Sequence, residues 1–116
     1  MEKVIEIDGK QVPFKSSRRT GLIFKKQFGK DLNSEITRVA NMESLTKKTV
    51  TIADLNDFDS IFNLLWSLAK TANQKIPDPS KWIEDFNEFP IKKTLIEVQG
   101  LFIDCLRYKK ITFIKE

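Results

Sequence analysis

Histidine is absent from this 116-residue chain, and cysteine occurs only once. Histidine is the commonest general base and a frequent zinc ligand in proteins, so its absence excludes catalytic and zinc sites that depend on imidazole. The four glycines are too widely separated along the chain to form a phosphate-binding loop. The sequence therefore predicts a protein that is not an enzyme and that has no catalytic residue, metal site or cofactor.

Two other candidates for chemistry, a cysteine and a set of three aspartates, are better explained by structural roles. Cys105 has no histidine partner and falls on the apolar face of a predicted helix, which indicates a small core residue rather than a nucleophile. Asp54, Asp57 and Asp59 look like part of a calcium loop, but the ligand spacing, the central glycine and the terminal glutamate are missing. We interpret these acids as first-turn residues favoured by a helix dipole.

Long hydrophobic runs are also missing. No apolar stretch approaches the roughly 18 residues of a membrane span, and the N-terminus lacks the basic-then-apolar order of a signal peptide. A lone cysteine agrees with a reducing compartment. We therefore expect a cytoplasmic protein that does not interact with membranes.

Composition and charge describe one ordinary globular domain. Hydrophobic residues make up 41% and charged residues 31% of the chain, which is enough to bury a core without disulfides. The net charge of +4 is uneven: residues 1–30 carry +5, residues 31–54 carry −1, residues 55–90 carry −3 and residues 91–116 carry +3. The basic ends either pack beside the acidic middle or offer a surface to an acidic partner, and we favour the first interpretation.

The chain is predicted to begin with a β-hairpin over residues 1–15. Two β-prone stretches, 3–7 and 11–15, flank Asp8-Gly9, a dipeptide typical of tight turns. Pro13 cannot donate to a ladder, so its strand should lie at an edge.

A helical body is predicted over residues 16–110. Ser16 and Ser17 should cap a helix from Arg18 to Phe28 that ends at Gly29. Its inward residues are expected to be Leu22, Phe24 and Phe28. Asp31 should cap a second helix, in which the apolar stripe consists of Leu32, Ile36, Val39 and Ala40. Beyond Met42 we expect a loop or short extended piece, and Thr51 with Asp54 resembles a capping pair for the next helix.

The longest strongly apolar stretch, Leu55 to Ala72, is predicted to be the central core helix. Its expected apolar face consists of Leu55, Phe58, Ile61, Phe62, Leu65, Trp66, Leu68, Ala69 and Ala72. Its expected polar face consists of Asp59, Ser60, Asn63, Ser67, Lys70, Thr71 and, beyond the helix, Gln74. So wide an apolar arc requires neighbours on two sides, a partner protein, or self-association.

Two further helices are expected after the central one. Asp78 and Pro79 should begin a short helix that carries an aromatic stripe and ends at Pro90. That stripe consists of Trp82, Ile83, Phe86 and Phe89. A last helix should run from Ile91 to Tyr108, with one face made of Ile91, Leu95, Val98, Phe102, Cys105 and Leu106. Residues 111–116 are predicted as a tail, either a short strand or a docking segment. The predicted fold class is mainly helical α+β: an N-terminal hairpin and about five helices packed around a central one.

Two groups of residues are candidates for partner binding. The basic group consists of Arg18, Arg19, Lys25 and Lys26, with Lys30 just beyond. The aromatic group consists of Trp82, Phe86 and Phe89. Basic helix faces are usually only solvated, and aromatic residues at helical spacing are usually core, so both groups also have an ordinary structural interpretation.

Several short segments occur in a distinctive order. Ile-Glu-Ile-Asp-Gly-Lys at 5–10 precedes the basic helix, and Leu-Leu-Trp-Ser-Leu-Ala-Lys follows at 64–70. Pro-Asp-Pro-Ser at 77–80 then leads into Trp-Ile-Glu-Asp-Phe at 82–86. In this layout the chain resembles the tail assembly chaperones of long-tailed phages, particularly phages and prophages of Gram-positive bacteria. The resemblance spans nearly the whole chain and is weakest at 42–53 and after Tyr108.

The resemblance implies a role in tail morphogenesis. Such a chaperone binds the tape measure protein, recruits tail tube subunits around it, and is absent from the finished virion. The family supplies no catalytic residues. The alternative, suggested by the +5 charge of residues 1–30, is a small basic nucleic-acid-binding or regulatory domain. Nucleic-acid binding is the less favoured of the two because no sequence signature of a nucleic-acid-binding fold accompanies the charge.

Overall fold

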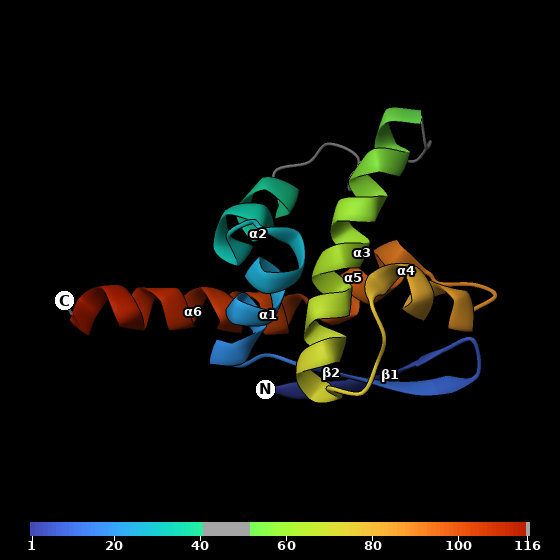
Figure 1. The fold of residues 1–116 in the computed structure, drawn as a ribbon, viewed down its shortest axis with the longest axis horizontal. Coiled ribbons are helices and arrows are strands. Elements are labelled where there is room, and N and C mark those ends of the chain that lie inside the picture. The colour runs from blue at the N-terminus through green and yellow to red at the C-terminus, as the bar shows by residue number, and fades with distance from the viewer. Residues whose placement is uncertain (41–51, 116) are drawn as a thin grey trace.

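The computed structural model describes residues 1–40 and 52–115, and for 52–57 and 108–115 it describes the helix but not the side chains. Within these ranges there are two strands, six α-helices and one 3-10 helix. In chain order they are β1 (Glu2–Ile7), β2 (Lys10–Lys15), α1 (Arg18–Phe28), α2 (Leu32–Ala40), α3 (Ile52–Ala72), α4 (Pro79–Trp82), the 3-10 helix η2 (Ile83–Asp85), α5 (Ile91–Glu97) and α6 (Gln99–Lys115). The predicted mainly helical α+β class with an N-terminal hairpin is confirmed (Figure 1).

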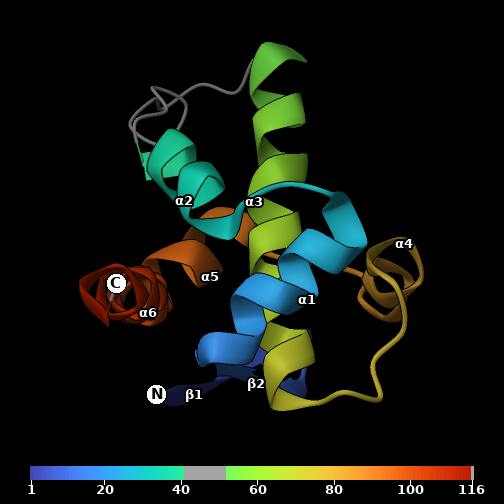
Figure 2. The same ribbon diagram turned by 60° about the vertical axis from the view of Figure 1, so that its left-hand side comes forward.

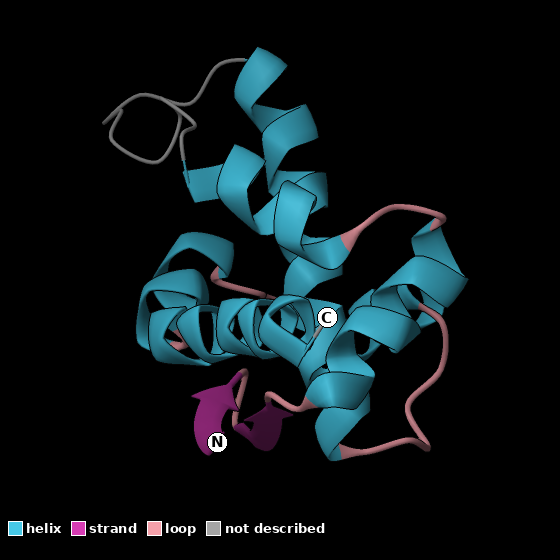
Figure 3. Cartoon of the chain, turned by 90° about the vertical axis from the view of Figure 1, so that its left-hand side faces the viewer, coloured by secondary structure: helices cyan, strands magenta, loops and turns pink. Residues whose placement is uncertain are grey.

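The other elements are arranged around α3. The hairpin lies at the C-terminal end of α3, and β2 contacts that helix directly (Figure 1). Helices α2 and α6 lie to one side of α3 and α4 lies on the other side (Figures 1 and 2), while α1 crosses in front of α3 in Figure 2. Figure 3 shows the two strands below the helical body. This placement of α2 and α6 on the same side of α3 positions the candidate site described below.

The hairpin forms as predicted. Asp8 (φ 54°) and Gly9 (φ 77°) make the two-residue turn with left-handed backbone angles, and the pairing brings Ile7 opposite Lys10. The alternating inward side chains are buried against α3 and its neighbours; they are Ile5, Ile7, Val12 and Phe14. Pro13 is tolerated because a two-stranded sheet consists only of edge strands.

Helix α1 has the predicted ends, but one of its predicted inward residues is wrong. Ser17 accepts a hydrogen bond from the Arg19 backbone N–H and forms a capping box with Thr20, and Gly29 ends the helix at φ 71°. Phe24 is buried, whereas Leu22 is 72% exposed. The core position one turn before Phe24 is taken by Thr20, whose hydroxyl is satisfied by Thr71 at 2.8 Å. Leu22 lies about 200° around the helix from Phe24 and therefore faces solvent.

Helix α2 follows the prediction with one exception. The Asp31 carboxylate accepts a hydrogen bond from the Ser34 backbone N–H at 2.9 Å, which confirms the predicted cap. Leu32, Ile36 and Val39 are buried. Ala40, which we expected in the same stripe, is exposed at the last residue of the helix.

The region before α3 lies partly outside the described residues. This applies to the expected loop after Met42, to Thr51, and to the side chain of Asp54, so the predicted capping pair is not described.

Helix α3 is the core helix, but it is buried more completely than its pattern predicts. Ile61, Leu65 and Leu68 are each 0% exposed. Leu64, omitted from the predicted apolar face, is buried, and so is Ser67, which was assigned to the polar face. The reason is that β2, α1, α2 and α5 contact α3 from different sides, leaving no solvent face along its middle turns.

Two buried polar groups on α3 have hydrogen-bond partners, one within the helix and one beyond it. The Ser67 hydroxyl donates to the Asn63 carbonyl at 3.0 Å, and the Trp66 indole N–H donates to the Pro77 carbonyl at 2.9 Å. Hydrogen bonds to the helix's own carbonyls allow a serine to lie in the core without a desolvation penalty.

The segment after α3 is less helical than predicted. Pro79 occupies the first helical position as expected, but Asp78 makes no side-chain cap. Helix α4 and η2 together reach only Asp85, and Phe86 is extended (φ −119°, ψ 132°). The predicted helix up to Pro90 is therefore wrong, because the aromatic spacing that indicated it reflects packing of four rings on one another.

The predicted last helix is two helices. Val98 (φ −105°, ψ 12°) separates α5 from α6, and its backbone N–H donates to the carbonyls of both Thr94 and Leu95. Helix α6 then continues to Lys115, so the predicted strand in the 111–116 tail is wrong. Gly100 lies in the first turn of α6, where its low helix propensity costs less than it would mid-helix.

A pair of leucine truncations tests the burial pattern. Leu65→Ala should reduce the free energy of unfolding by about 2–5 kcal/mol because it leaves a cavity beside the middle of α3. Leu22→Ala is the matched control and should change it by about 0.5 kcal/mol or less, since that side chain is already in water. Urea unfolding followed by circular dichroism measures both. An equal loss of unfolding free energy in both variants would show that Leu22 is buried and that α1 is rotated relative to the structure described here.

Candidate functional site

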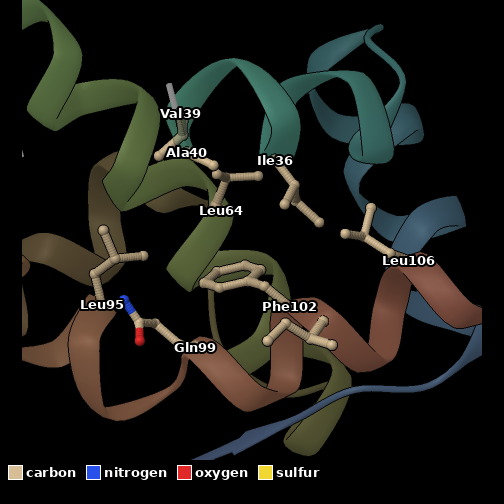
Figure 4. A pocket seen from close by; sticks show the side chains of 9 residues that line it. Ile36, Val39, Ala40, Leu64, Leu95, Gln99, Phe102 and Leu106 are labelled. Atoms are coloured by element: carbon tan, nitrogen blue, oxygen red, sulfur yellow. The ribbon is translucent and has the colours of Figure 1, made fainter. Parts of the chain in front are cut away.

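An apolar groove opens at the side of the molecule where α2 and α6 face each other (Figure 4). Its volume is about 260 Å³. Four helices contribute the lining residues Ile36, Val39, Ala40, Leu64, Leu95, Gln99, Phe102, Ile103 and Leu106. Gln99 is the one polar residue in this lining, so the groove offers contact area and few hydrogen-bonding groups.

The groove has a buried floor and exposed walls. Leu64 and Phe102, at 1% and 6% exposure, lie between α2 and α6 (Figure 4). On the α6 wall, Ile103 is 61% and Leu106 36% exposed. Figure 4 shows Leu106 pointing across the groove toward Ile36 on α2. A large apolar side chain that enters from solvent would therefore meet apolar atoms on both sides and beneath it.

Sequence spacing explains both walls. Ile36, Val39 and Ala40 follow the i, i+3, i+4 rule and so lie on one side of α2. Phe102 and Leu106, four residues apart, form one row on α6, and Ile103 lies beside that row. Ile96, next in the chain to the lining residue Leu95, is also 58% exposed. An exposed apolar cluster beside a hollow of this kind is typical of protein-interaction sites.

The helices that form the walls are basic. Helices α2, α5 and α6 together contain seven basic and three acidic residues. Two of the acids, Glu35 and Asp104, are buried, and the third, Glu97, is half-buried. Arg38, Lys93 and Arg107 are exposed. Arg38 is paired with Glu35 at 2.8 Å and Arg107 with Asp104 at 3.9 Å, so both of these charges are balanced within their own helices.

The two buried acids hold parts of the wall helices in place. The Arg38 guanidinium donates to both carboxylate oxygens of Glu35, at 2.8 and 3.1 Å, and this hydrogen bonding holds the pKa of Glu35 below its usual value. Ser16 donates its hydroxyl hydrogen to the Asp104 carboxylate at 2.7 Å. Asp104 thus ties α6 to the end of the hairpin.

The basic candidate residues lie on the surface of α1, where Arg19 also contacts the Gln74 side chain. Arg18, Arg19, Lys25 and Lys26 are all exposed on α1. Arg18 and Lys25 are seven residues apart, which is about two turns or 10.5 Å along one side of the helix. This basic α1 face is a separate surface from the groove, to which α1 contributes no lining residue.

The aromatic candidate residues are mostly core. Trp82 is 4% exposed, and Phe86 and Phe89 are half-buried. Their rings form a cluster with Phe62, with centroid separations from 5.1 to 5.7 Å. Trp82 is therefore a core residue, as the structural interpretation expected, and Phe86 and Phe89 pack against it while remaining partly exposed. Because α4 lies across α3 from α2 and α6, the cluster and the groove do not form one site (Figure 2).

Sequence reasoning missed the groove. Phe102 and Leu106 were expected on an inward face, but Leu64, Ile96 and Ile103 were not singled out. The available signal was Ile103, an isoleucine at a position where the amphipathic pattern of the helix calls for a polar residue. The pairing of α2 with α6 is a long-range contact that no local pattern contains.

The single cysteine of the chain, Cys105, is buried in α6. Burial raises the pKa of the Cys105 thiol to about 12, so it remains protonated at neutral pH. Among the described side chains, no group of three or more potential metal ligands is close enough together to hold an ion. None of the helices, judged over the described residues, has the length and apolar character needed to cross a bilayer.

Comparison with known proteins returned no match: the chain fits no protein-family model, and no curated protein or solved structure is significantly similar to it.

The cysteine provides a test of the core beneath α6. With a pKa of about 12, the Cys105 thiol should react with a disulfide reagent such as DTNB at pH 8 at least about a hundred-fold more slowly in the native protein than in guanidinium, because only the thiolate attacks. Absorbance at 412 nm follows the reaction. Reaction at the same rate in both solutions would mean that the side chain is accessible in the native state.

Glu35 provides a pH test of the α2 wall. Because the native pKa of Glu35 is lowered, its contribution to stability is present above the ordinary glutamate pKa of about 4.3 and is lost as pH falls through the lower native pKa. Glu35→Gln should therefore lower the free energy of unfolding by about 1 kcal/mol at pH 7. The difference in free energy of unfolding between Glu35→Gln and the unsubstituted protein should become smaller below pH 4.

The matched control for this pH test is Glu84→Gln, which removes an exposed carboxylate outside the groove. Urea unfolding at several pH values measures each variant. A constant difference between Glu35→Gln and the unsubstituted protein from pH 7 to pH 3 would contradict the assigned ion pair.

Proposed function

We propose that the chain is a phage tail assembly chaperone that works in the bacterial cytoplasm. In this proposal it binds the tape measure protein, brings tail tube subunits to it, and leaves before the tail is complete. The observation that carries the proposal is the open apolar groove between α2 and α6, with its exposed wall residues Ile103 and Leu106. The resemblance of the sequence to such chaperones supports it independently.

The chemistry of the groove suits a reversible chaperone. A tape measure protein is a long helical chain whose apolar stripe would aggregate before a tube surrounds it. A shallow groove lined by eight apolar residues can cover a short part of that stripe. Each contact would be weak, and many copies of a small domain along one long chain would together give adequate occupancy.

The groove is a poorer fit for a small molecule. Small-molecule sites usually have volumes of about 300–1,000 Å³ and several convergent polar groups. This groove has about 260 Å³ and a single polar lining residue, Gln99. Large apolar side chains of a protein partner are the occupants that need neither depth nor hydrogen bonds.

The basic α1 face is a second surface for a second partner. In the proposal, Arg18, Arg19, Lys25 and Lys26 contact tail tube subunits while the groove holds the tape measure protein. The aromatic group plays no direct part, because Trp82 is enclosed by its neighbours.

One observation favours the alternative function. The four exposed basic residues of α1 could contact phosphates, as a small nucleic-acid-binding domain requires. Binding through phosphates weakens steeply as salt rises, whereas apolar covering does not. A titration with duplex DNA and with RNA across salt concentrations therefore separates the two functions.

Co-expression with the tape measure protein of the same genome tests the proposal. The two proteins should elute together from a size-exclusion column. Ile103→Asp should weaken the complex by about ten-fold or more, because a charge replaces an apolar contact worth about 1.5–3 kcal/mol. The matched control is Leu22→Asp, the same kind of change at a site that is 72% exposed on α1. Loss of the complex with both variants, or no complex with the unsubstituted chain, would count against the proposal.

A further inference from the structure

We infer that the basic α1 face binds an acidic protein segment that carries one apolar side chain between its carboxylates. Such a segment would belong to the second partner of the proposed function, on which the inference rests for the origin of the segment. The residues that carry it lie on α1 alone and are separate from the groove.

The four cations of the basic α1 face surround Leu22. Arg18 and Arg19 lie four and three residues before this leucine, and Lys25 and Lys26 lie three and four residues after it. At about 100° and about 1.5 Å per residue, the five side chains occupy an arc of about 120° and a length of about 12 Å, with Leu22 near the middle of both. Leu22 is 72% exposed. The face is therefore a leucine in water with a pair of cations about one turn away on each side.

The charge of this face is not balanced within the part of the chain that the structure describes. The ion pairs among the described side chains have the Met1 amine, Arg38 and Arg107 as their cations, and none of these lies on α1. Helix α1 itself contains no acid. Arg19 contacts the Gln74 amide, which is neutral, so the contact leaves the charge of the guanidinium in place.

The acids near α1 are engaged elsewhere or distant. Glu35 on α2 and Asp104 on α6 are buried and paired with cations of their own helices. Asp31, in the turn between α1 and α2, accepts hydrogen bonds from the Ser34 backbone N–H and hydroxyl, both at 2.9 Å. Asp59, the one acid among the described side chains of α3, lies about 10.5 Å along that helix from the tryptophan that packs on the last residue of α1. The acids that complement this face must therefore come from another molecule.

An acidic helix with one central apolar residue complements the face. Glutamates three and four residues before and after a leucine repeat the spacing of the α1 cations, so an aligned helix would place a pair of carboxylates near each pair of cations. The leucine of the segment would meet Leu22 between these pairs, and both would leave water. Because complementary charge contributes more to specificity and association rate than to affinity, binding should be weak and sensitive to salt.

Other classes of partner fit the face less well. A second copy of this chain would place four cations against four cations, which opposes association. A nucleic acid would contact the cations through its phosphates but would leave the exposed leucine against charged oxygens. A bilayer would accept the leucine, but even one acyl chain gives only marginal membrane binding, and a leucine side chain buries less apolar area than that.

Three helix-forming peptides of about 15 residues serve as probes. The first has a central leucine with glutamates three and four residues before and after it. The second has alanine in place of the leucine, and the third has lysines in place of the glutamates. Fluorescence anisotropy of labelled peptides measures each dissociation constant at about 0.02 M and 0.15 M salt. A short duplex DNA and vesicles of phosphatidylserine with phosphatidylcholine are measured beside them.

The first peptide should bind the unsubstituted protein at least about ten-fold more tightly than the third at low salt, and the difference should become smaller at higher salt. The second should bind about five-fold to ten-fold more weakly than the first, because the central apolar contact is lost. Leu22→Ala should weaken the first peptide by about the same factor and should leave the second unchanged, since the second has no leucine to meet it.

A charge-reversed variant tests the cations. Arg18→Glu combined with Arg19→Glu should weaken the first peptide at least about ten-fold at low salt. Acids in the first turn are favoured by the helix dipole, so this variant should keep α1 folded, which circular dichroism checks. The matched control is Lys81→Glu combined with Lys93→Glu, which changes the net charge equally at two exposed lysines of α4 and α5. It should change the dissociation constant by about two-fold or less.

Several results would overturn the inference. They are equal binding of the first and third peptides, no binding of the first, and equal weakening by the two charge-reversed variants. Tighter binding of the DNA or of the vesicles than of the first peptide at about 0.15 M salt would also overturn it, because the partner would then be a phosphate-bearing molecule.

The outcomes also separate this inference from the proposed function. Leu22→Ala should leave the complex with tape measure protein intact, because that complex forms through the groove. Peptide selectivity without a complex with tape measure protein would leave the α1 assignment standing and remove the function. A complex with tape measure protein without peptide selectivity would support the function and remove the inference.

Discussion

The middle of α3 is buried on nearly every side, and this burial determines how the other elements are arranged. From Ile61 to Ala69 the helix has one partly exposed residue, Asn63. A helix that is apolar around its circumference needs neighbours on every side. The chain has only short elements to supply them, so a hairpin and several brief helices surround one long one. Polar groups buried along α3 also have partners: the Ser67 hydroxyl donates to the Asn63 carbonyl of the same helix, and the Trp66 indole N–H donates to the Pro77 carbonyl beyond it.

Short helices that cover a long one leave gaps between their side chains, and the groove between α2 and α6 is one such gap. The helices α2 and α6 each pack on the body through one side, and the space between them is filled only from beneath, by Leu64 and Phe102. Two apolar side chains, Ile103 and Leu106, remain in water beside this groove, and exposed apolar clusters of this kind are typical of protein-interaction sites.

Local signals in the sequence predicted the element ends well. The Asp8-Gly9 turn, the Ser17 and Asp31 caps and the Gly29 stop each depend on a few neighbouring residues, and each appears where expected. Features that depend on distant contacts were not predictable in the same way. Thr20 takes a core position because Thr71, far along the chain, satisfies its hydroxyl. The aromatic residues after Pro79 have the spacing of a helix, but they have it because Trp82 and Phe89 pack on Phe62.

In the candidate site, too, some features follow from local sequence and others depend on distant contacts. The exposure of the basic α1 residues follows from amphipathic spacing alone, so it could be predicted. The groove requires α2 and α6 to meet, and it requires the chain to change direction at Val98, which the continuous apolar stripe from Leu95 to Leu106 conceals. That bend has a geometric consequence. Because Val98 joins α5 to α6, a change in its backbone angles would turn α6 relative to α5 and reshape the groove while every lining side chain stayed the same.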